Sequence, residues 1–276
     1  MKLATTQPQY ITHLAGEVRG AASAADKIPY RRISALSVIL FILLWEGVAR
    51  LEWIRPIFIS SPTRIFSAAI WLFQHDFSYD LWVSGVEFFL GFGLAILIGV
   101  PLGLALGWYR TLHAVFDPFV SALYATPRVA LLPVIILWLG IGINSKIAVV
   151  FLGGIFPILI SIIAGMRTLD EGLLKCAYAF GASAGQIFRT LAIPSTIPFI
   201  AAGLRIGVGR ALVGIVVGEL VAARAGIGHM MSIAGSIFQT DRVYVGVIIL
   251  ALCGYSLTAL LKRLENRFES WRPHRG

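Results

Sequence analysis

The chain has 276 residues, of which 58% are hydrophobic, and its mean hydropathy is +0.83. This composition excludes a soluble globular protein with a polar exterior and indicates an all-α, multi-pass membrane protein. The net charge of +9 does not indicate a nucleic-acid partner, because the basic residues fall mainly between hydrophobic segments and form no patch beside aromatic residues. The two cysteines, Cys176 and Cys253, have no partners at metal-ligand spacing, so we expect neither a metal site nor a disulfide framework.

The first predicted span follows a polar N-terminal segment. Residues 1–32 are mixed and basic, and the apolar run at 33–51 is long enough to cross a hydrocarbon layer of about 30 Å. Residues 52–83 contain three tryptophans, which are typical of a helix at the membrane interface. Within them, Ser61 and Pro62 offer an N-cap and a first helical residue. We therefore expect a transmembrane helix followed by a periplasmic or interfacial segment.

The second predicted span, at about residues 83–108, carries glycines at four-residue spacing. This spacing places small residues on one helical face, where they allow close contact with another helix. We expect three helix-packing glycines here: Gly99, Gly103 and Gly107.

The remaining sequence predicts four more spans, which gives six in all. They lie at about residues 112–142, 147–166, 196–220 and 243–261. We expect the third span to be broken by Pro118, Pro127 and Pro133, since proline interrupts helices. Its first half would then lie along the interface, and residues 129–139 would enter the membrane.

Residues 167–194 form the one long polar interruption in the second half of the chain, and they predict a helix, a sharp turn and a second helix. Thr168 and Glu171 have the spacing of a capping box that would begin the first helix. Gly181 stands where a glycine in a left-handed conformation would end it.

The second helix of this stretch is expected to begin at a capping box formed by Ser183 and Gln186. It should end near Ile193, because Pro194 disfavours helical geometry in the residue before it. Two short helices with an apolar stripe indicate a protrusion that docks onto another protein. These signals alone leave an ordinary cytoplasmic loop as the alternative.

The fifth span carries five residues of interest on one face of an ideal helix. They lie within about 80 degrees of one another at 100 degrees per residue, and they are Gly203, Gly207, Arg210, Gly214 and Gly218. A glycine face packs against another helix or lines a narrow path, and packing is the commoner use.

Charged residues within a span usually face a bundle interior or a water-filled cavity. Arg205 lies near the cytoplasmic end and could extend to the interface, so Arg210 and Glu219 are the better candidates for a translocation pathway. Structural pairing of these residues with a neighbouring span is the alternative, and Glu87 is one partner to consider.

The distribution of Lys and Arg predicts the orientation of the chain. If the N-terminus is cytoplasmic, 15 of these residues lie inside, six lie outside and two lie within the fifth span. The positive-inside rule therefore places both termini and the central polar stretch in the cytoplasm. We expect no catalytic residues, because the sequence contains neither a nucleophile–base set nor a glycine-rich phosphate loop.

The central stretch resembles the cytoplasmic coupling loop of ABC importer permeases. The family pattern is Glu-Ala-Ala, three residues, Gly, nine residues, Ile, one residue and Leu-Pro. This sequence matches that spacing, but Lys175 and Cys176 replace the glutamate and the first alanine. The resemblance implies a contact with the ATP-binding subunit through Lys175, Cys176, Ala177, Gly181, Ala182, Ser183, Leu191 and Pro194.

Four further segments resemble the nitrate, sulfonate and taurine branch of these permeases: SPTRIFSAAIWL, LGFGLAILIGVPLGLALGW, ATPRVALLPVIILWLGIG and AGLRIGVGRALVGIVVGEL. The resemblance covers about residues 35–265 and implies the type I ABC importer (MetI-like) fold. Residues 84–262 would form the core permease domain, with the coupling loop at 167–194 and a basic cytoplasmic tail at 263–276.

The same resemblance implies a permease homodimer in a bacterial inner membrane. Two ATP-binding subunits would use the ATP, and this chain would bind no cofactor. A periplasmic or surface-anchored solute-binding protein would deliver a small anion such as nitrate, a sulfonate or taurine. Another small solute, such as a pyrimidine precursor, stays open. A self-sufficient channel or secondary carrier is disfavoured, because the spans show no inverted repeat.

Overall fold

A computed structural model describes residues 30–51, 55, 57–75 and 77–268. It consists of two units, residues 1–56 and 57–276, and each is treated by itself. The predicted polar segment at 1–32 lies almost wholly outside the described residues. Part of the predicted tail, residues 269–276, lies outside them too.

The described part of the first unit is a single helix, α2 (Tyr30–Arg50). It is long and apolar enough to cross a membrane, which matches the span predicted at 33–51. Apolar side chains are exposed along most of its length, including Leu36, Phe41 and Leu43. Such a surface is stable only against lipid or other protein.

The regular secondary structure in the described part of the second unit is entirely helical. Its elements are α3 (Pro62–Gln74), α4 (Phe77–Trp108), α5 (Arg110–Ala125), α6 (Arg128–Leu139), α7 (Ile143–Met166), α8 (Glu171–Ala179), α9 (Ala184–Ile187), the π-helical turn η1 (Phe188–Ala192), α10 (Ile193–Ala222), α11 (Ile227–Ser236) and α12 (Thr240–Phe268). Four of them, α4, α7, α10 and α12, could span a membrane, and α10 does so together with α9 and η1. With α5 and α6, which meet at a 99° bend, counted as one broken span, the described residues hold six candidate spans including α2, the number predicted.

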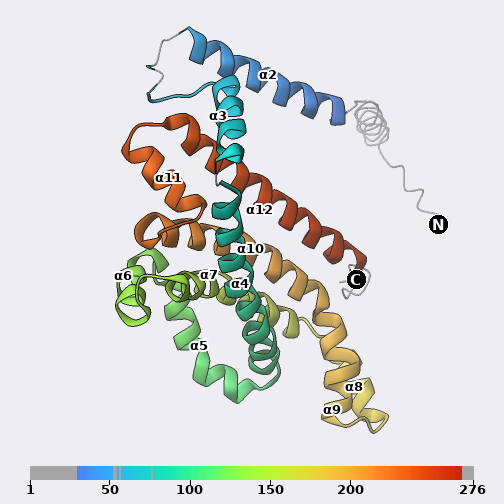
Figure 1. The fold of residues 1–276 in the computed structure, drawn as a ribbon. Coiled ribbons are helices and arrows are strands. Elements are labelled where there is room, and N and C mark those ends of the chain that lie inside the picture. Colours follow the sequence, from blue (N-terminus) through green and yellow to red (C-terminus); the bar gives the residue numbers. More distant parts are fainter. Residues whose placement is uncertain (1–29, 52–54, 56, 76, 269–276) are drawn as a thin grey trace, which may run out of the picture. The chain divides into compact units, whose positions relative to one another are not determined.

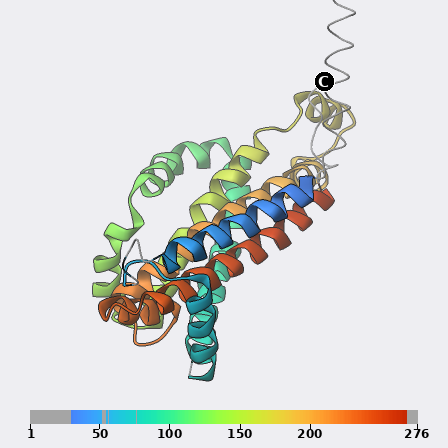
Figure 2. The ribbon, with the colours of Figure 1, turned by 90° about the horizontal axis from the view of Figure 1, so that it is seen from above.

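Helix α7 is the centre of the second unit, packed between α4 and α10 (Figure 1). Its sequence is apolar on all sides, and its core residues include Val150, Ile158 and Ile162, each fully buried. In Figure 2, α7, α10 and α12 run side by side, whereas α8 and α9 lie beyond the end of α10. The polar loop therefore projects from the packed spans.

The glycine faces of α4 and α10 are both turned toward α7. A Cβ atom on Gly103 would lie 3.0 Å from the Cβ atom of Ile162, and one on Gly107 would lie 2.6 Å from that of Met166. On α10, a Cβ atom on Gly207 would lie 3.2 Å from the carbonyl oxygen of Gly154. Larger side chains would push the helices apart. A similarly close approach holds at Gly99, Gly203 and Gly214, whereas a Cβ atom on Gly218 would lie at an ordinary contact distance of 3.7 Å from Lys146.

For the predicted interfacial segment, the N-cap is confirmed and the C-terminal boundary is wrong. Ser61 caps α3 by accepting from the backbone N–H of Arg64 at 3.3 Å, and Pro62 is the first helical residue. Helix α4, however, begins at Phe77 instead of residue 83, so Trp82 belongs to the span. The edge-on contact of Phe73 with Phe77, whose ring centroids are 5.2 Å apart, continues the packing from one helix into the next.

The third span breaks at only one of its three prolines. Pro118 lies inside α5 and Pro133 inside α6, and the chain bends at Thr126 and Pro127. Thr126 is extended, with φ −68° and ψ 128°, as the residue before a proline prefers to be. This bend brings the first residue of α6, Arg128, to the side of α10.

Candidate functional site

The first helix of the polar loop is capped by a residue other than the predicted one. Asp170 is the N-cap of α8, and its Oδ1 atom accepts from the backbone N–H of Leu173 at 3.0 Å. The hydroxyl of Thr168 instead donates to the carbonyl of Gly165, in the last turn of α7, at 2.8 Å. The predicted box of Thr168 with Glu171 is therefore wrong, because Thr168 is used to finish the preceding span.

The turn after α8 has the conformation that the sequence predicts. Gly181 has φ 80°, in the left-handed region that favours glycine. Its N–H donates to the carbonyl of Tyr178 at 2.9 Å, and the N–H of Ala182 donates to Ala177 at 3.0 Å. This pair of bonds is a Schellman motif, which closes the end of the helix.

The predicted capping box of Ser183 is confirmed. Its hydroxyl accepts from the N–H of Gln186 at 3.3 Å, and the Gln186 side chain accepts from the N–H of Ser183 at 2.8 Å. Hydrogen bonds thus fix the turn on both sides, so its shape does not depend on a partner.

An apolar surface covers the tip of the loop. Phe180 is 87% exposed, and Leu173 and Tyr178 are also exposed. Large apolar side chains gathered on a projecting loop are typical of a protein contact. The sequence predicted an apolar stripe on these helices but did not single out Phe180, although an aromatic residue directly before a turn glycine is a usable signal. Among the described residues, Lys175 forms an exposed pair with Glu171 at 3.7 Å, which contributes little stability.

The second helix of the loop does not end at Ile193 as predicted. Ile193 has helical geometry, with φ −60° and ψ −52°, and α9 continues through η1 into α10. The wider π-helical turn accommodates Pro194, which lacks an N–H group. The hydroxyls of Ser195 and Thr196 donate to the carbonyls of Leu191 and Ala192, both at 2.7 Å. The second helix of the loop and the fifth span are therefore one continuous helical rod.

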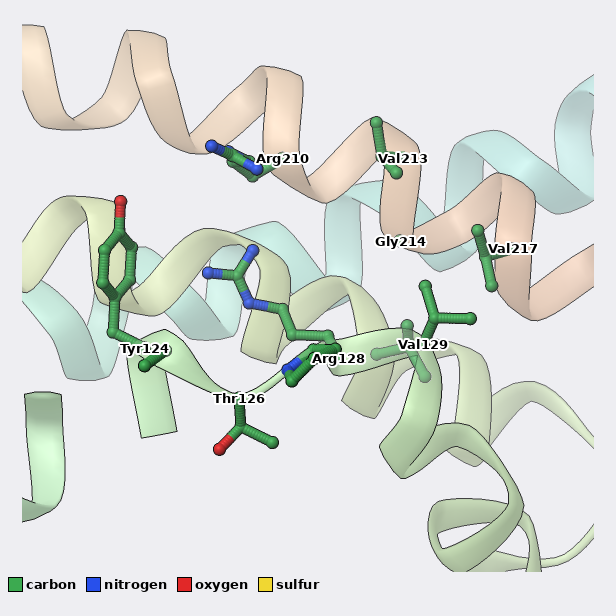
Figure 3. A pocket seen from close by; sticks show the side chains of 11 residues that line it. Tyr124, Thr126, Arg128, Val129, Arg210, Val213, Gly214 and Val217 are labelled. Atoms are coloured by element: carbon green, nitrogen blue, oxygen red, sulfur yellow. The ribbon is translucent and has the colours of Figure 1, made fainter. Parts of the chain in front are cut away.

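A cavity of about 360 Å³ lies beside the middle of α10 (Figure 3). It is bounded by the bend between α5 and α6, by Val149 of α7 and by the α10 residues from Arg210 to Val217. Figure 3 shows the guanidinium groups of Arg128 and Arg210 at the same space. Arg210 was predicted as a pathway residue, whereas Arg128 was not.

The two arginines form an unusual electrostatic pair. Their like charges lie close enough to repel each other, and within the described residues neither forms an ion pair. The Nε atom of Arg128 is buried without a hydrogen-bond partner. The ring of Tyr124, with its centroid 5.8 Å from the Arg128 guanidinium, is a favourable cation–π neighbour.

The position of Arg128 also corrects the charge count. The 15 inside residues of that count include Arg128, but Arg128 lies beside Arg210 at the cavity. Lys146, counted outside, is buried in α7. Without these two residues, 14 Lys and Arg residues remain inside and five remain outside, so the excess is still on the cytoplasmic side.

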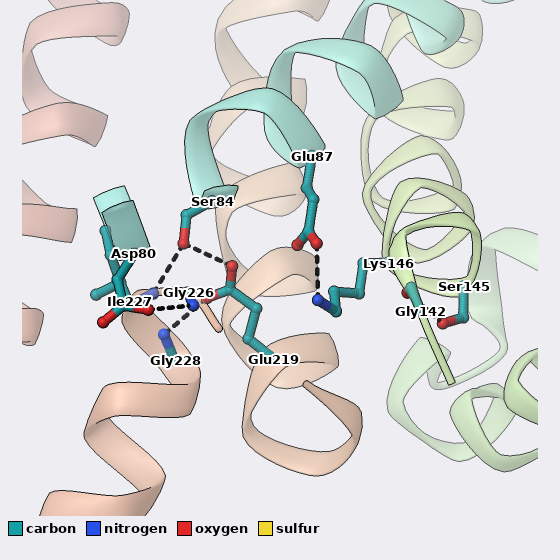
Figure 4. A network of polar contacts seen from close by, with 10 residues as sticks. All are labelled: Asp80, Ser84, Glu87, Gly142, Ser145, Lys146, Glu219, Gly226, Ile227 and Gly228. Atoms are coloured by element: carbon teal, nitrogen blue, oxygen red, sulfur yellow. Dashed lines mark hydrogen bonds and ion pairs between the residues drawn. The ribbon is translucent and has the colours of Figure 1, made fainter. Parts of the chain in front are cut away.

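Glu219 lies in a different place from Arg210 (Figure 4). Its carboxylate accepts from the hydroxyl of Ser84 at 2.5 Å and from the N–H of Gly228 at 2.7 Å. Next to it, Asp80 accepts from the N–H of Gly226 at 2.8 Å. These acceptors satisfy free amides at the start of α11, where the helix dipole favours negative charge. The structure therefore puts Glu219 at a helix junction and does not bring it to the cavity.

Glu87 has its own partner in this region. Its Oε1 atom accepts from the Nζ atom of Lys146 at 2.7 Å, and both side chains are buried. Arg205 does not pair with Glu219 and instead donates to Glu265 at 3.1 Å. Glu87, Lys146 and Glu219 thus form one cluster, and the Arg205–Glu265 pair and the two cavity arginines lie apart from it.

Residues 95–270 match the protein-family model for the binding-protein-dependent transport system inner membrane component. The chain belongs to this family. It is therefore a multi-pass inner-membrane permease, and its family is one of transport components and not of ATPases.

Curated relatives of the permease support the same family. It is 31% identical over 245 residues to the taurine transport system permease protein TauC of Escherichia coli (strain K12), covering 87% of this chain and 88% of TauC. It is 32% identical over 246 residues to the formylaminopyrimidine transport permease protein ThiX of Halalkalibacterium halodurans, covering 88% of this chain and 98% of ThiX. The permease is thus similar to carriers of chemically different small solutes.

A solved structure of the MetNI methionine ABC transporter, described as inward-facing, contains a chain with the same fold as the permease. The TM-score is 0.61 at 20% sequence identity, and the match covers 70% of this chain and 95% of that chain. At this identity the similarity shows the fold alone, which is that of a type I ABC importer permease.

Proposed function

We propose that the permease works in an ATP-driven importer, as one of two identical subunits that enclose the path of a small anion. ATP-binding subunits would dock on the cytoplasmic side and use the ATP, so this chain itself would bind no cofactor. A periplasmic or surface-anchored solute-binding protein would deliver the solute. Family membership and the similarity to a taurine permease support this proposal.

The continuous rod from the loop into α10 is the observation that carries the proposal. A rigid rod transmits a displacement at one end to the other, and the cavity with Arg210 lies along this one. The Schellman turn and the capping box hold the docking tip in shape before any partner binds. We assign the contact with the ATP-binding subunit to the exposed tip with Phe180 and to Lys175, Cys176, Ala177, Gly181, Ala182, Ser183, Leu191 and Pro194.

Substitution of the turn glycine tests the coupling role. Gly181→Val should uncouple ATP hydrolysis from uptake, because a β-branched residue is strongly disfavoured at φ 80°. Gly181→Asn is the matched control, since Asn tolerates this region and should keep most of the coupling. The measurement is binding-protein-stimulated ATPase activity and uptake in vesicles at equal protein level. Unchanged coupling in Gly181→Val would remove the loop from its assigned role.

The proposal also places both termini and the loop in the cytoplasm. Cys176 is exposed on α8, so a thiol reagent that cannot cross membranes should label it only after cells are permeabilised. Cys176→Ser controls for labelling at Cys253. Labelling of Cys176 in intact cells would invert the orientation.

A second candidate solute is a pyrimidine precursor, because the sequence identity to ThiX, 32%, is close to the 31% identity to TauC. The two cations at the cavity favour the anion, since a neutral ring would leave their repulsion uncompensated. Competition of each solute class for uptake would decide between the two.

A further inference from the structure

We infer that Arg128 and Arg210 together bind one oxyanion, of the sulfonate or nitrate type, as it passes through the permease. The inference rests on the proposed function and names the chemistry that the cavity selects. It also assigns Arg128, at the bend of the third span, as a second binding residue opposite α10.

The electrostatic potential in the cavity favours a negatively charged ligand. Two guanidinium groups share it, and its described lining contains no carboxylate. The pair repels, and the repulsion between like charges grows as water is excluded. Cations among membrane spans normally face an acid or water. An anion placed between the arginines would offset their repulsion and the loss of hydration of the partly buried Arg128.

The hydrogen-bond donors agree with this charge argument. Arg128 has a buried Nε atom with no partner, and a guanidinium can donate two parallel bonds to two oxygens of one group. The Tyr124 ring restricts the Arg128 side chain by cation–π contact. The hydroxyl of Thr126 points away from the cavity and donates to Ala122, at 2.8 Å, so it does not compete. Nitrate and sulfonate groups present two or more oxygens at the required spacing.

The rest of the cavity limits what is attached to the anion. Its walls are mainly aliphatic, formed by Val129, Val149, Val213 and Val217, and its volume of about 360 Å³ is small. Such walls accept a short apolar tail. They offer no acid to an ammonium group, so an alkanesulfonate or nitrate complements the cavity better than a zwitterion does. Binding should be weak, because a transported ion must also leave.

Anion-dependent thermal stabilisation of the purified permease–ATPase complex tests the inference. At constant ionic strength, sodium methanesulfonate or sodium nitrate should raise the unfolding midpoint of the wild-type complex relative to sodium chloride, whose anion has no oxygens, and to uracil. Arg128→Gln and Arg210→Gln should each weaken this response about 10- to 100-fold in concentration, the expected loss of charged hydrogen bonds. Arg205→Gln, on the same helix but paired with Glu265, is the control and should respond as the wild type does.

A charge-reversal variant gives a second test, which does not require a measured change in the affinity for the anion. In Arg210→Glu the new carboxylate would face Arg128 and occupy the anion's place. The variant complex should be at least as stable as the wild type and should show no response to methanesulfonate or nitrate. A wild-type complex that responds to neither anion, or an Arg210→Glu complex that still responds, would overturn the inference. Binding-protein-stimulated ATPase activity, measured on the same samples, reports the proposed function separately.

Discussion

Two charged clusters among the spans of this permease differ in sign and in surroundings. In the first, Glu87 meets Lys146 at 2.7 Å and Glu219 accepts from Ser84 and Gly228, all of them buried. In the second, Arg128 and Arg210 share a cavity and no acid among the described residues pairs with them. The comparison teaches that burial of charge alone does not identify a pathway. A charge whose partners lie within the chain holds helices together, whereas one without such partners is available to a solute.

The first cluster has a clear structural task. Its residues come from α4, α7 and α10. Two of them, Ser84 and Glu219, also accept hydrogen bonds from the first backbone N–H groups of α11 (Figure 4). In lipid, the hydrophobic effect does not favour one apolar helix over another as a packing partner. Polar contacts therefore help to determine which helices pack together. The second cluster ties together no elements in this way.

The largest effect is expected from breaking the first cluster. Lys146→Met should destabilise the permease by about 3–5 kcal/mol, because it leaves the buried Glu87 carboxylate uncompensated. Thermal unfolding and the yield of assembled complex measure this loss.

Removing both partners is the matched control. Glu87→Leu combined with Lys146→Met replaces the ion pair by apolar side chains and should recover most of the lost stability. If the double variant is as unstable as Lys146→Met, the pair is not the source of the effect.

In the second cluster, substitutions should change the free energy of unfolding less and should lower uptake more than those in the first cluster. Arg210→Gln and Arg128→Gln should each lower uptake about 10- to 100-fold, the loss of a charged hydrogen bond to the solute. Assembly should be unchanged, because neither guanidinium bonds to another helix among the described residues. The measurement is uptake of radiolabelled alkanesulfonate or nitrate, whichever the wild type carries, per assembled complex. A loss of assembled complex would mean that the arginines are structural.

The smallest effect is expected at Arg205. Its pair with Glu265 is partly exposed, so Arg205→Gln should cost less than about 1 kcal/mol and leave uptake near the wild-type level. This variant separates the loss of an arginine on α10 from the loss of the cavity. A tenfold fall in uptake would extend the pathway to the Arg205 end of the helix.

Local signals in the sequence were enough for much of the fold. The apolar runs predict the spans, and the left-handed glycine and the Ser183 capping box predict the turn of the coupling loop, because such features depend on neighbouring residues. The predicted stop at Ile193 is wrong because the π-helical turn, which the sequence does not reveal, absorbs Pro194. The cap at Thr168 is wrong because Asp170 and Thr168 compete for the role, and the end of α7 takes the hydroxyl.

The candidate site was only half predictable. Arg210 stands out as a charge within an apolar span, but Arg128 looks like an ordinary residue at a membrane boundary until the chain bends at Pro127. Glu219 looks equally suited to a pathway, and only its contacts with Ser84 and Gly228 place it at a helix junction. Distances between residues on different spans depend on tertiary packing, which periodicity does not encode.

The central claim is that the like-charged pair serves transport and the opposite-charged pair serves assembly. Uptake per assembled complex, measured side by side in vesicles for two double variants, tests it most directly. The account predicts that Arg128→Gln with Arg210→Gln assembles fully and loses uptake, whereas Glu87→Leu with Lys146→Met keeps uptake per complex at close to the wild-type rate. Uptake retained without the two arginines, or lost per complex without Glu87 and Lys146, would contradict it.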